Sequence, residues 1–215
     1  AVAILQLVQA GKLALSDPLG KYLKGYPNAD VARQVTIEHL LTHTGGTGDI
    51  FGPEFDAHRK KLRTLDDFVK VYGVRGLAFP PGTQWSYSNY GFVLLGVVIE
   101  KVTGQSYYDY VAQHVYAPAG MRNTGSFPED HEVPLRSTGY TKWRGPDTAV
   151  PPGQTWFPNT SSLPHRGSSA GGGYSTAADL LAFANALEGH RLLDAEHTAH
   201  LTTVKPGPAE PMSYA

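Results

Sequence analysis

The sequence predicts a chain built mainly of helices and ordered loops, with little β-sheet. Several segments place apolar residues at helical spacing and carry capping residues at their ends. Strand patterns are few, and the best of them is Gly-Tyr-Thr-Lys-Trp at 139–143. The stretch 127–173 is rich in Pro, Gly and Ser and predicts a long ordered loop. Loops of this length in a compact domain often line binding sites, so we expect a functional surface there.

The first element is expected to be a buried helix, because residues 1–10 are apolar on nearly every face. We expect Gly11 to end it in the left-handed conformation that helix C-termini favour. No Ser, Thr, Asp or Asn precedes the apolar run, so the helix lacks a usual N-cap. At the other end of the chain, 206–215 predicts a loop with no closing element. We therefore expect the natural protein to begin upstream of Ala1 and to continue past this loop.

Five further helices are predicted from apolar periodicity and from the residues that flank it. They are expected at 64–73, opened by Thr64; at 92–102, ended by Gly104; from Ser106 to about Tyr116; from Thr176 to near Gly189; and from Asp194 through His197 and His200.

Composition narrows the classes of function. The 215 residues are 41% hydrophobic, which is ordinary for a protein with a buried core. Net charge is −1, and the short basic stretch 58–63 is expected to be a solvated helix face, so no nucleic-acid partner is predicted. No cysteine is present, which excludes disulfides, thiolate nucleophiles and thiolate metal ligands. No apolar stretch reaches the roughly 18 residues that a transmembrane helix needs.

Four blocks of sequence carry a resemblance to a known family. They are 3–18, which ends in Leu-Ser-Asp-Pro; 36–46, Thr-Ile-Glu-His-Leu-Leu-Thr-His-Thr-Gly-Gly; 80–91, Pro-Pro-Gly-Thr-Gln-Trp-Ser-Tyr-Ser-Asn-Tyr-Gly; and 169–176, Ser-Ala-Gly-Gly-Gly-Tyr-Ser-Thr. In this order they resemble class C-like β-lactamases, penicillin-binding proteins, D-alanyl-D-alanine carboxypeptidases and family VIII carboxylesterases. The resemblance implies an α+β fold of the β-lactamase/transpeptidase type. Within that fold, residues 1–215 form a partial domain that supplies mainly the helical region and the site-lining loops.

Tyr87 and Asn89 match the Tyr-x-Asn motif of that family. Enzymes of this kind must deprotonate a serine hydroxyl as it attacks and then protonate the leaving group. A phenol with an ordinary pKa near 10 is a poor base alone, but a neighbouring lysine cation favours its phenolate. The resemblance implies that Tyr87 is this base and acid and that Asn89 binds the substrate. The alternative reading is that Tyr87, one of 12 tyrosines, merely packs under a loop.

Two other family motifs are expected to lie outside the 215 residues. No Ser-x-x-Lys occurs, and the resemblance implies that its serine lies about two helical turns before Ala1. The resemblance implies that the Lys/His-x-Gly motif lies on closing strands of the family that the 215 residues do not reach, so we expect this motif to be missing as well. Without the nucleophile and the oxyanion donors, this chain alone is expected to be inactive. Gly171 and Gly172 are expected to let the backbone run close to the substrate, and so are predicted as substrate-binding residues.

Two further patterns suggest chemistry but lack its context. Ser169 stands in Gly-x-Ser-x-Gly, which needs a strand before it and a helix directly after it, and neither is predicted. We expect Ser169 not to be a nucleophile. His39 and His43 stand four apart on a predicted helix, but Leu40 occupies the position where zinc proteases carry Glu. We expect a polar helix end with His43 hydrogen-bonded in the following loop, and no metal site.

The resemblance implies hydrolysis of a small-molecule ester, amide or β-lactam through an acyl-serine intermediate, with no metal or organic cofactor. Fold does not choose among these substrates. The alternative is a non-catalytic relative that retains recognition of penicillin or peptidoglycan. A bacterial periplasmic or secreted location is implied only by the resemblance, and the oligomeric state stays open.

Overall fold

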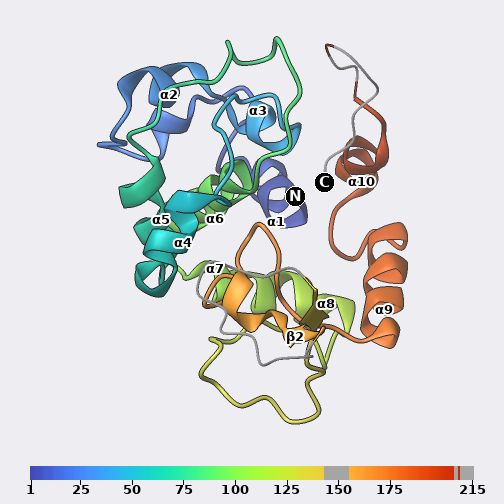
Figure 1. Ribbon diagram of the computed structural model, residues 1–215. Coiled ribbons are helices and arrows are strands. Elements are labelled where there is room, and N and C mark those ends of the chain that lie inside the picture. The colour runs from blue at the N-terminus through green and yellow to red at the C-terminus, as the bar shows by residue number, and fades with distance from the viewer. Residues whose placement is uncertain (143–154, 206–207, 209–215) are drawn as a thin grey trace.

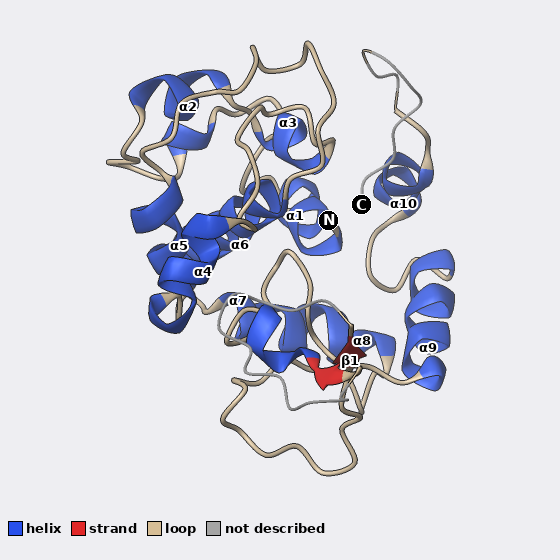
Figure 2. Ribbon diagram, in the orientation of Figure 1, coloured by secondary structure: helices blue, strands red, loops and turns tan. Residues whose placement is uncertain are grey.

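The structure is a computed structural model that describes residues 1–142, 155–205 and 208, and helices dominate this part of the chain (Figures 1 and 2). The first half contains α1 (Val2–Gln9), η1 (Leu19–Lys21), α2 (Ala29–Gln34), α3 (Ile37–Leu41), α4 (Pro53–His58), η2 (Arg59–Lys61), α5 (Leu65–Tyr72) and α6 (Asn89–Thr103). The second half contains α7 (Tyr107–Val111), η3 (Ala112–Tyr116), α8 (Ala117–Ala119), β1 (Tyr140–Thr141), β2 (Phe157–Pro158), η4 (Asn159–Ser162), α9 (Ala177–Glu188) and α10 (Ala195–Thr202).

The helices predicted from sequence are confirmed, and their predicted caps explain where they begin. Thr64 closes a capping box with Asp67 at the start of α5, and Ser106 accepts a backbone hydrogen bond in the first turn of α7. Thr176 and Asp194 cap α9 and α10 in the same way. These side chains satisfy N–H groups that the first turn of a helix leaves without partners.

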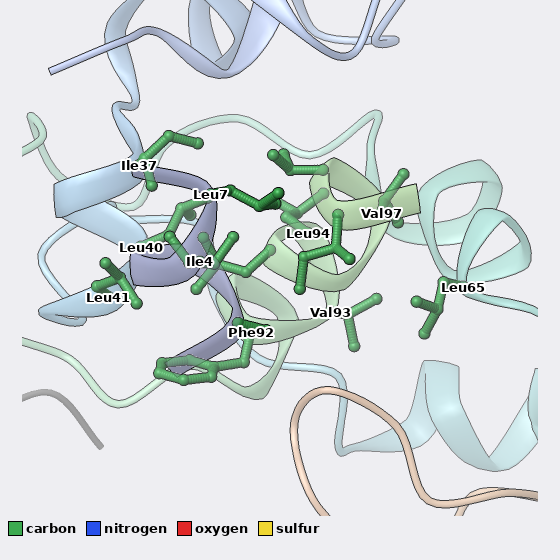
Figure 3. Packing of buried hydrophobic residues seen from close by; sticks show 14 of the residues in the cluster. Ile4, Leu7, Ile37, Leu40, Leu41, Leu65, Phe92, Val93, Leu94 and Val97 are labelled. Atoms are coloured by element: carbon green, nitrogen blue, oxygen red, sulfur yellow. The ribbon is translucent and has the colours of Figure 1, made fainter. Parts of the chain in front are cut away.

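The helix α6 is the centre of the hydrophobic core. Its residues from Tyr90 to Ile99 are all buried, and it packs against α1, α3, α5 and α7. In Figure 3, Ile4 and Leu7 of α1 lie against the side chains of Leu94 and its neighbours on α6. The core therefore fixes both ends of α6, including the N-terminal turn that carries Asn89.

The predicted strand at 139–143 is present over two residues. Tyr140 and Thr141 pair antiparallel with Phe157 and Pro158, and this is the only named sheet in the described residues. Trp143 lies outside the described residues. The long loop expected over 127–173 holds this small sheet, and its part at 143–154 also lies outside them.

The basic stretch at 58–63 is exposed at Lys60, Lys61 and Arg63, as the sequence predicted for a solvated helix face, but Arg59 departs from that prediction. Arg59 is 13% exposed, and its guanidinium donates to the carbonyl oxygens of Thr160 and Leu163, each at 2.6 Å, and pairs with Glu129. Arg59 thus joins the helical first half of the chain to two later segments, one that carries Glu129 and one that carries Thr160 and Leu163.

Among the helices that the structure describes, none has both the length and the apolar character that crossing a bilayer requires.

Candidate active site

Tyr87, Ser88 and Asn89 form the entry to α6. Ser88 is the N-cap, and its Oγ accepts a hydrogen bond from the Gly91 N–H at 2.9 Å. Asn89 is the first residue of the helix, so its backbone is fixed by the helix itself. Tyr87 precedes the cap, outside any helix or strand, and is 50% exposed. The motif therefore presents an accessible phenol at the end of a rigid buried helix.

The side chains of Tyr87 and Asn89 face each other. The Tyr87 hydroxyl donates to the Asn89 Oδ1 over 3.4 Å, a long hydrogen bond. The Tyr87 ring lies 4.6 Å from the buried ring of His43, measured between centroids, and His43 stacks on Phe92 at 5.1 Å. Tyr87 is thus packed on one face and open to solvent elsewhere, unlike a tyrosine buried under a loop.

A single loop holds this motif in place; we call residues 43–49 the cradle loop. The carbonyl of His43 accepts from the Ser86 N–H at 3.0 Å, and its ring Nδ1 accepts from the Ser88 N–H at 3.1 Å. The Ser88 hydroxyl bonds to the carbonyl of Gly48 and lies 3.2 Å from the hydroxyl of Thr47. The Tyr87 segment is therefore bonded through its backbone on both sides of the tyrosine.

Asp49 ends the cradle loop and contacts Asn89 directly. Its Oδ1 accepts from the Asn89 N–H at 3.1 Å, and its Oδ2 accepts from the Asn89 Nδ2 at 3.1 Å. Its Oδ1 also accepts from the N–H of Ile50 at 2.7 Å. One carboxylate thereby anchors both the backbone and the side chain of a motif residue.

His43 is a buried neutral acceptor, in agreement with the expectation for the loop after α3. Its φ is 57°, a left-handed conformation unusual for residues other than glycine, and it lies two residues past the end of the helix. Burial lowers its pKa, while the charge of Asp49 opposes this shift. Because Nδ1 accepts from Ser88, the hydrogen of the neutral ring resides on Nε2, which has no partner within the described residues.

His39 has a different structural role. Its Nδ1 accepts from the Thr36 N–H and completes the capping box of α3, at 3.2 Å. The two histidines are therefore engaged in separate hydrogen bonds, and the helical spacing that suggested a shared ligand ends before His43. No group of three or more potential metal ligands is found in the described residues.

Gly171 and Gly172 lie at a tight turn in which Ser168 and Gly171 exchange backbone hydrogen bonds. Both have positive φ, 125° and 85°, so the turn favours glycine. Gly172 lines a cavity of about 760 Å³ between the loops at 122–139 and 159–176. Tyr87 and Asn89 are not among the residues that line it. That Gly171 and Gly172 contact the substrate stays a prediction.

Ser169 occupies the tip of the same turn. Its Oγ is buried without a hydrogen-bond partner in the described residues and lies against Gly96 of α6. Irregular chain precedes it and α9 begins eight residues later, so the strand–turn–helix context of a nucleophile elbow is missing.

The sequence pointed to Tyr87 and Asn89 as candidate site residues, but it did not predict that the cradle loop supports them. The block at 36–46 carried the family resemblance, yet the bonds to residues 86–89 span 40 or more positions in the chain. The loop at 45–48 is hydrogen-bonded to Ala78 through Gly46 and to Ser88 through Gly48. The sequence feature that could have indicated a tightly folded loop is the group of three glycines, Gly45, Gly46 and Gly48, next to Asp49.

Comparison with known proteins gives a consistent result. The family model described as Beta-lactamase matches residues 1–211. The putative penicillin-binding protein PbpX of Bacillus subtilis is 35% identical over 188 residues, which are 87% of this chain and 43% of that protein.

Solved structures extend the match to the fold. A penicillin-binding protein from Bacillus halodurans superposes with a TM-score of 0.83 at 36% identity, covering 99% of this chain and 65% of that one. A D-stereospecific amidohydrolase from Streptomyces superposes with a TM-score of 0.74 at 30% identity, covering 99% and 66%. The chain therefore has the β-lactamase/transpeptidase-like fold and spans less than two thirds of each of these three proteins.

Proposed function

Because this chain belongs to the beta-lactamase family, we propose that its protein is a serine hydrolase that cleaves an ester, amide or β-lactam through an acyl-serine intermediate. In this proposal Tyr87 is the general base and acid, and Asn89 binds the substrate. The nucleophilic serine and its lysine come from a Ser-x-x-Lys motif outside the 215 residues, since none occurs within them.

One observation carries the proposal: the exposed Tyr87 hydroxyl and the Asn89 amide face each other at the N-terminal turn of a buried helix. Proton transfer needs a group held within hydrogen-bond reach of the reacting atoms. The cradle loop supplies that rigidity, because it bonds to Ser86, Ser88 and Asn89.

The proposed reaction proceeds in two halves. As the serine Oγ bonds to the substrate carbonyl carbon, its proton passes to the Tyr87 Oη. When the bond to the leaving nitrogen or oxygen breaks, Tyr87 returns that proton to the leaving group. Water then attacks the acyl-serine, and the serine Oγ recovers a proton as the acid product departs. Asn89 uses its Nδ2 to donate a hydrogen bond to a polar group of the substrate.

The test is a hydrolysis screen of the full-length protein with p-nitrophenyl butyrate, nitrocefin and a D-Ala-D-Ala peptide. For the best substrate, Tyr87→Phe should lower kcat by about 100-fold or more, the usual contribution of general acid–base catalysis, with a small change in KM. The matched control is Tyr140→Phe, which removes another exposed phenol. Equal kcat values for Tyr87→Phe and wild type would refute the assignment.

Covalent labelling tests the source of the nucleophile. A fluorophosphonate should label the full-length protein stoichiometrically and leave the isolated 215-residue chain unlabelled. Stoichiometric labelling of the isolated chain would show that the nucleophile lies within it, with Ser169 as the first residue to examine.

The second candidate is a non-catalytic relative that binds penicillin or peptidoglycan. The observation that favours it is the absence of Ser-x-x-Lys from residues 1–215. Reversible binding of a fluorescent penicillin by the full-length protein, without covalent labelling or turnover, would support this candidate and reject the hydrolase.

A further inference from the structure

We propose that Asp49 is a positioning residue that fixes which end of the Asn89 side-chain amide faces Tyr87. The inference rests on the proposed function, in which Tyr87 and Asn89 act together, but its structural content can be tested independently.

The carboxylate of Asp49 is committed to three N–H groups. Its Oδ1 accepts from the backbone of Asn89 at 3.1 Å and from that of Ile50 at 2.7 Å, while its Oδ2 accepts from the Asn89 Nδ2 at 3.1 Å. Backbone and side chain of Asn89 are thus bonded to opposite oxygens of one planar group. This two-point attachment restricts rotation of the amide.

The chemistry of the pair sets the direction of the amide. An ionised carboxylate can only accept hydrogen bonds, so the nitrogen of Asn89 must face Asp49. The oxygen of the amide is then left on the side of Tyr87, where its Oδ1 accepts from the phenol at 3.4 Å. The second hydrogen on Nδ2 stays available to a substrate acceptor. If the Asn89 amide were flipped, its acceptor oxygen would face Asp49 and its donor nitrogen would face Tyr87.

Asp49 is itself held by a second contact. Arg75 donates from Nη1 to the carbonyl oxygen of Asp49 at 2.6 Å, and its other guanidinium nitrogen pairs with Glu54. The Arg75 guanidinium also lies 4.3 Å from the ring centroid of buried Tyr72. The backbone of Asp49 is therefore tied to α4 and α5, so the carboxylate approaches Asn89 from a fixed direction.

Asp49→Asn is the most informative substitution, because it preserves shape and removes only the second acceptor oxygen. The Asn89 nitrogen would then meet another NH2 group if residue 49 keeps its bond to the backbone N–H groups. Two donors cannot pair, so the Asn89 amide is expected to turn over and present its oxygen to residue 49.

The structural test uses the full-length protein and the two Nδ2 protons of Asn89 in ¹⁵N-resolved NMR spectra. In the wild type one proton is bonded to a carboxylate and the other is free, so they should differ in shift and in solvent exchange. Asp49→Asn should change both, while Asp66→Asn, which removes an exposed partner of Lys101, should change neither. Unchanged Asn89 side-chain signals in Asp49→Asn would overturn the proposal.

The functional test uses the full-length protein. Asp49→Asn should lower kcat/KM by about 10- to 100-fold, the scale expected when a reacting group is misplaced, while the melting temperature stays near the wild-type value. A loss of activity that only follows the unfolded fraction would mean that Asp49 is structural, and would reject positioning. If the wild-type enzyme turns over no substrate but the NMR change is observed, the hydrolase proposal fails and the positioning of Asn89 stands.

Discussion

His43 shows how one side chain can link the cradle loop to the segment that carries Tyr87 and Asn89. Its ring is 2% exposed, accepts a hydrogen bond from the Ser88 N–H and lies against the rings of Tyr87 and Phe92. A protonated ring would lose its acceptor nitrogen and carry a charge in a buried site, a cost that the nearby charge of Asp49 offsets only in part. The Ser88 bond and the burial of the ring therefore both favour the neutral form.

We predict that His43 makes the stability of the chain depend on pH. The ordinary histidine pKa is about 6.5, and burial lowers the pKa of His43 in the folded chain. Below pH 6.5 the unfolded chain therefore binds a proton that the folded chain does not, so acid favours unfolding. The free energy of unfolding should be greatest above about pH 7 and fall as the pH drops through the folded-state pKa, by at most about 1.4 kcal/mol per pH unit for one proton.

The measurement is urea unfolding at several pH values, with the His43 ring signal followed by NMR. His39 and His200 have pKa values shifted in the same direction by burial, so a variant is needed to isolate His43. His43→Asn suits this purpose, because Asn tolerates positive φ and offers an oxygen acceptor that does not titrate. An identical pH slope in this variant would contradict the prediction.

For single residues, the sequence predicted candidate site residues only where a chemically useful side chain stands in a recognisable local motif. Tyr87 and Asn89 sit in a short motif before an apolar helix, and the structure brings their side chains together. Asp49 carries no local pattern of its own, and its importance arises from bonds to a residue 40 positions away. Side-chain pairing over such distances depends on how helices pack, which periodicity does not encode.

The helix α6 contains a close contact that explains one of its interior glycines. A Cβ added to Gly96 would collide with Ser169 Oγ and lie 2.8 Å from the Leu65 Cδ1 and 2.9 Å from the Ser169 Cβ. Alanine is preferred to glycine in a helix by about 1 kcal/mol, but overpacking a core costs about 1–3 kcal/mol. Packing should therefore outweigh propensity at this position.

We predict that Gly96→Ala lowers the free energy of unfolding by up to about 2 kcal/mol, measured by urea denaturation. Ser169→Gly removes the atoms that collide, so the double variant should recover part of the loss. Because the two residues touch, a double-mutant cycle should show a coupling of about 0.5 kcal/mol or more. Strictly additive effects would mean that the loop of Ser169 does not pack on α6.

At the element scale, helices with an apolar stripe and a capping residue were predicted well. The short helices α2 and α4 were not, and each buries a single residue, Val31 and Phe55. An apolar periodicity can be recognised only when a helix has several buried positions. The sequence pattern of α2 and α4 therefore does not predict them, and they depend on packing against neighbouring elements. The π-helical turn η3 between α7 and α8 was also beyond prediction, because a helical pattern does not report one extra residue per turn.

Across the whole molecule, Arg59 is one of the polar side chains that join the helical first half to the loops of the second half, and Arg63, which contacts His165, is another. The fork of Arg59 bonds to Glu129, Thr160 and Leu163, from 70 to 104 positions away. We predict that Arg59→Ala lowers the free energy of unfolding by about 2 kcal/mol, the scale of hydrogen bonds to a charged group. Limited proteolysis should show faster cleavage within 127–139 and 155–167.

Two comparisons sharpen this experiment. Arg59→Lys keeps the charge but cannot reproduce the planar fork, so it should behave more like Ala than like wild type. Arg33→Ala removes an exposed arginine that pairs with Asp30 and should change stability by less than about 1 kcal/mol. Equal protease resistance of the wild type and Arg59→Ala would show that the loops are held by other contacts.

Contacts between residues far apart in the chain, such as those of Arg59, are the part of the fold that the sequence pattern did not predict. The family resemblance placed the chain in the correct fold, and the comparisons confirm that fold. The pairing of β1 with β2 and the cavity beside Gly172 depend on loops far apart in the chain. Their composition predicted an ordered region but could not predict which residues meet.

The contacts between the cradle loop and the Tyr87 segment carry a thermodynamic consequence for ligand discovery. They join residues 40 and 45 positions apart, so they exist only in the folded chain, which alone holds the phenol and the amide in one fixed orientation. A compound that fits this fixed orientation would bind the native state in preference to the unfolded chain. By mass action, such a compound would raise the melting temperature by an amount that grows with the logarithm of its concentration over its Kd, which makes a thermal-shift screen selective for molecules shaped to this pair.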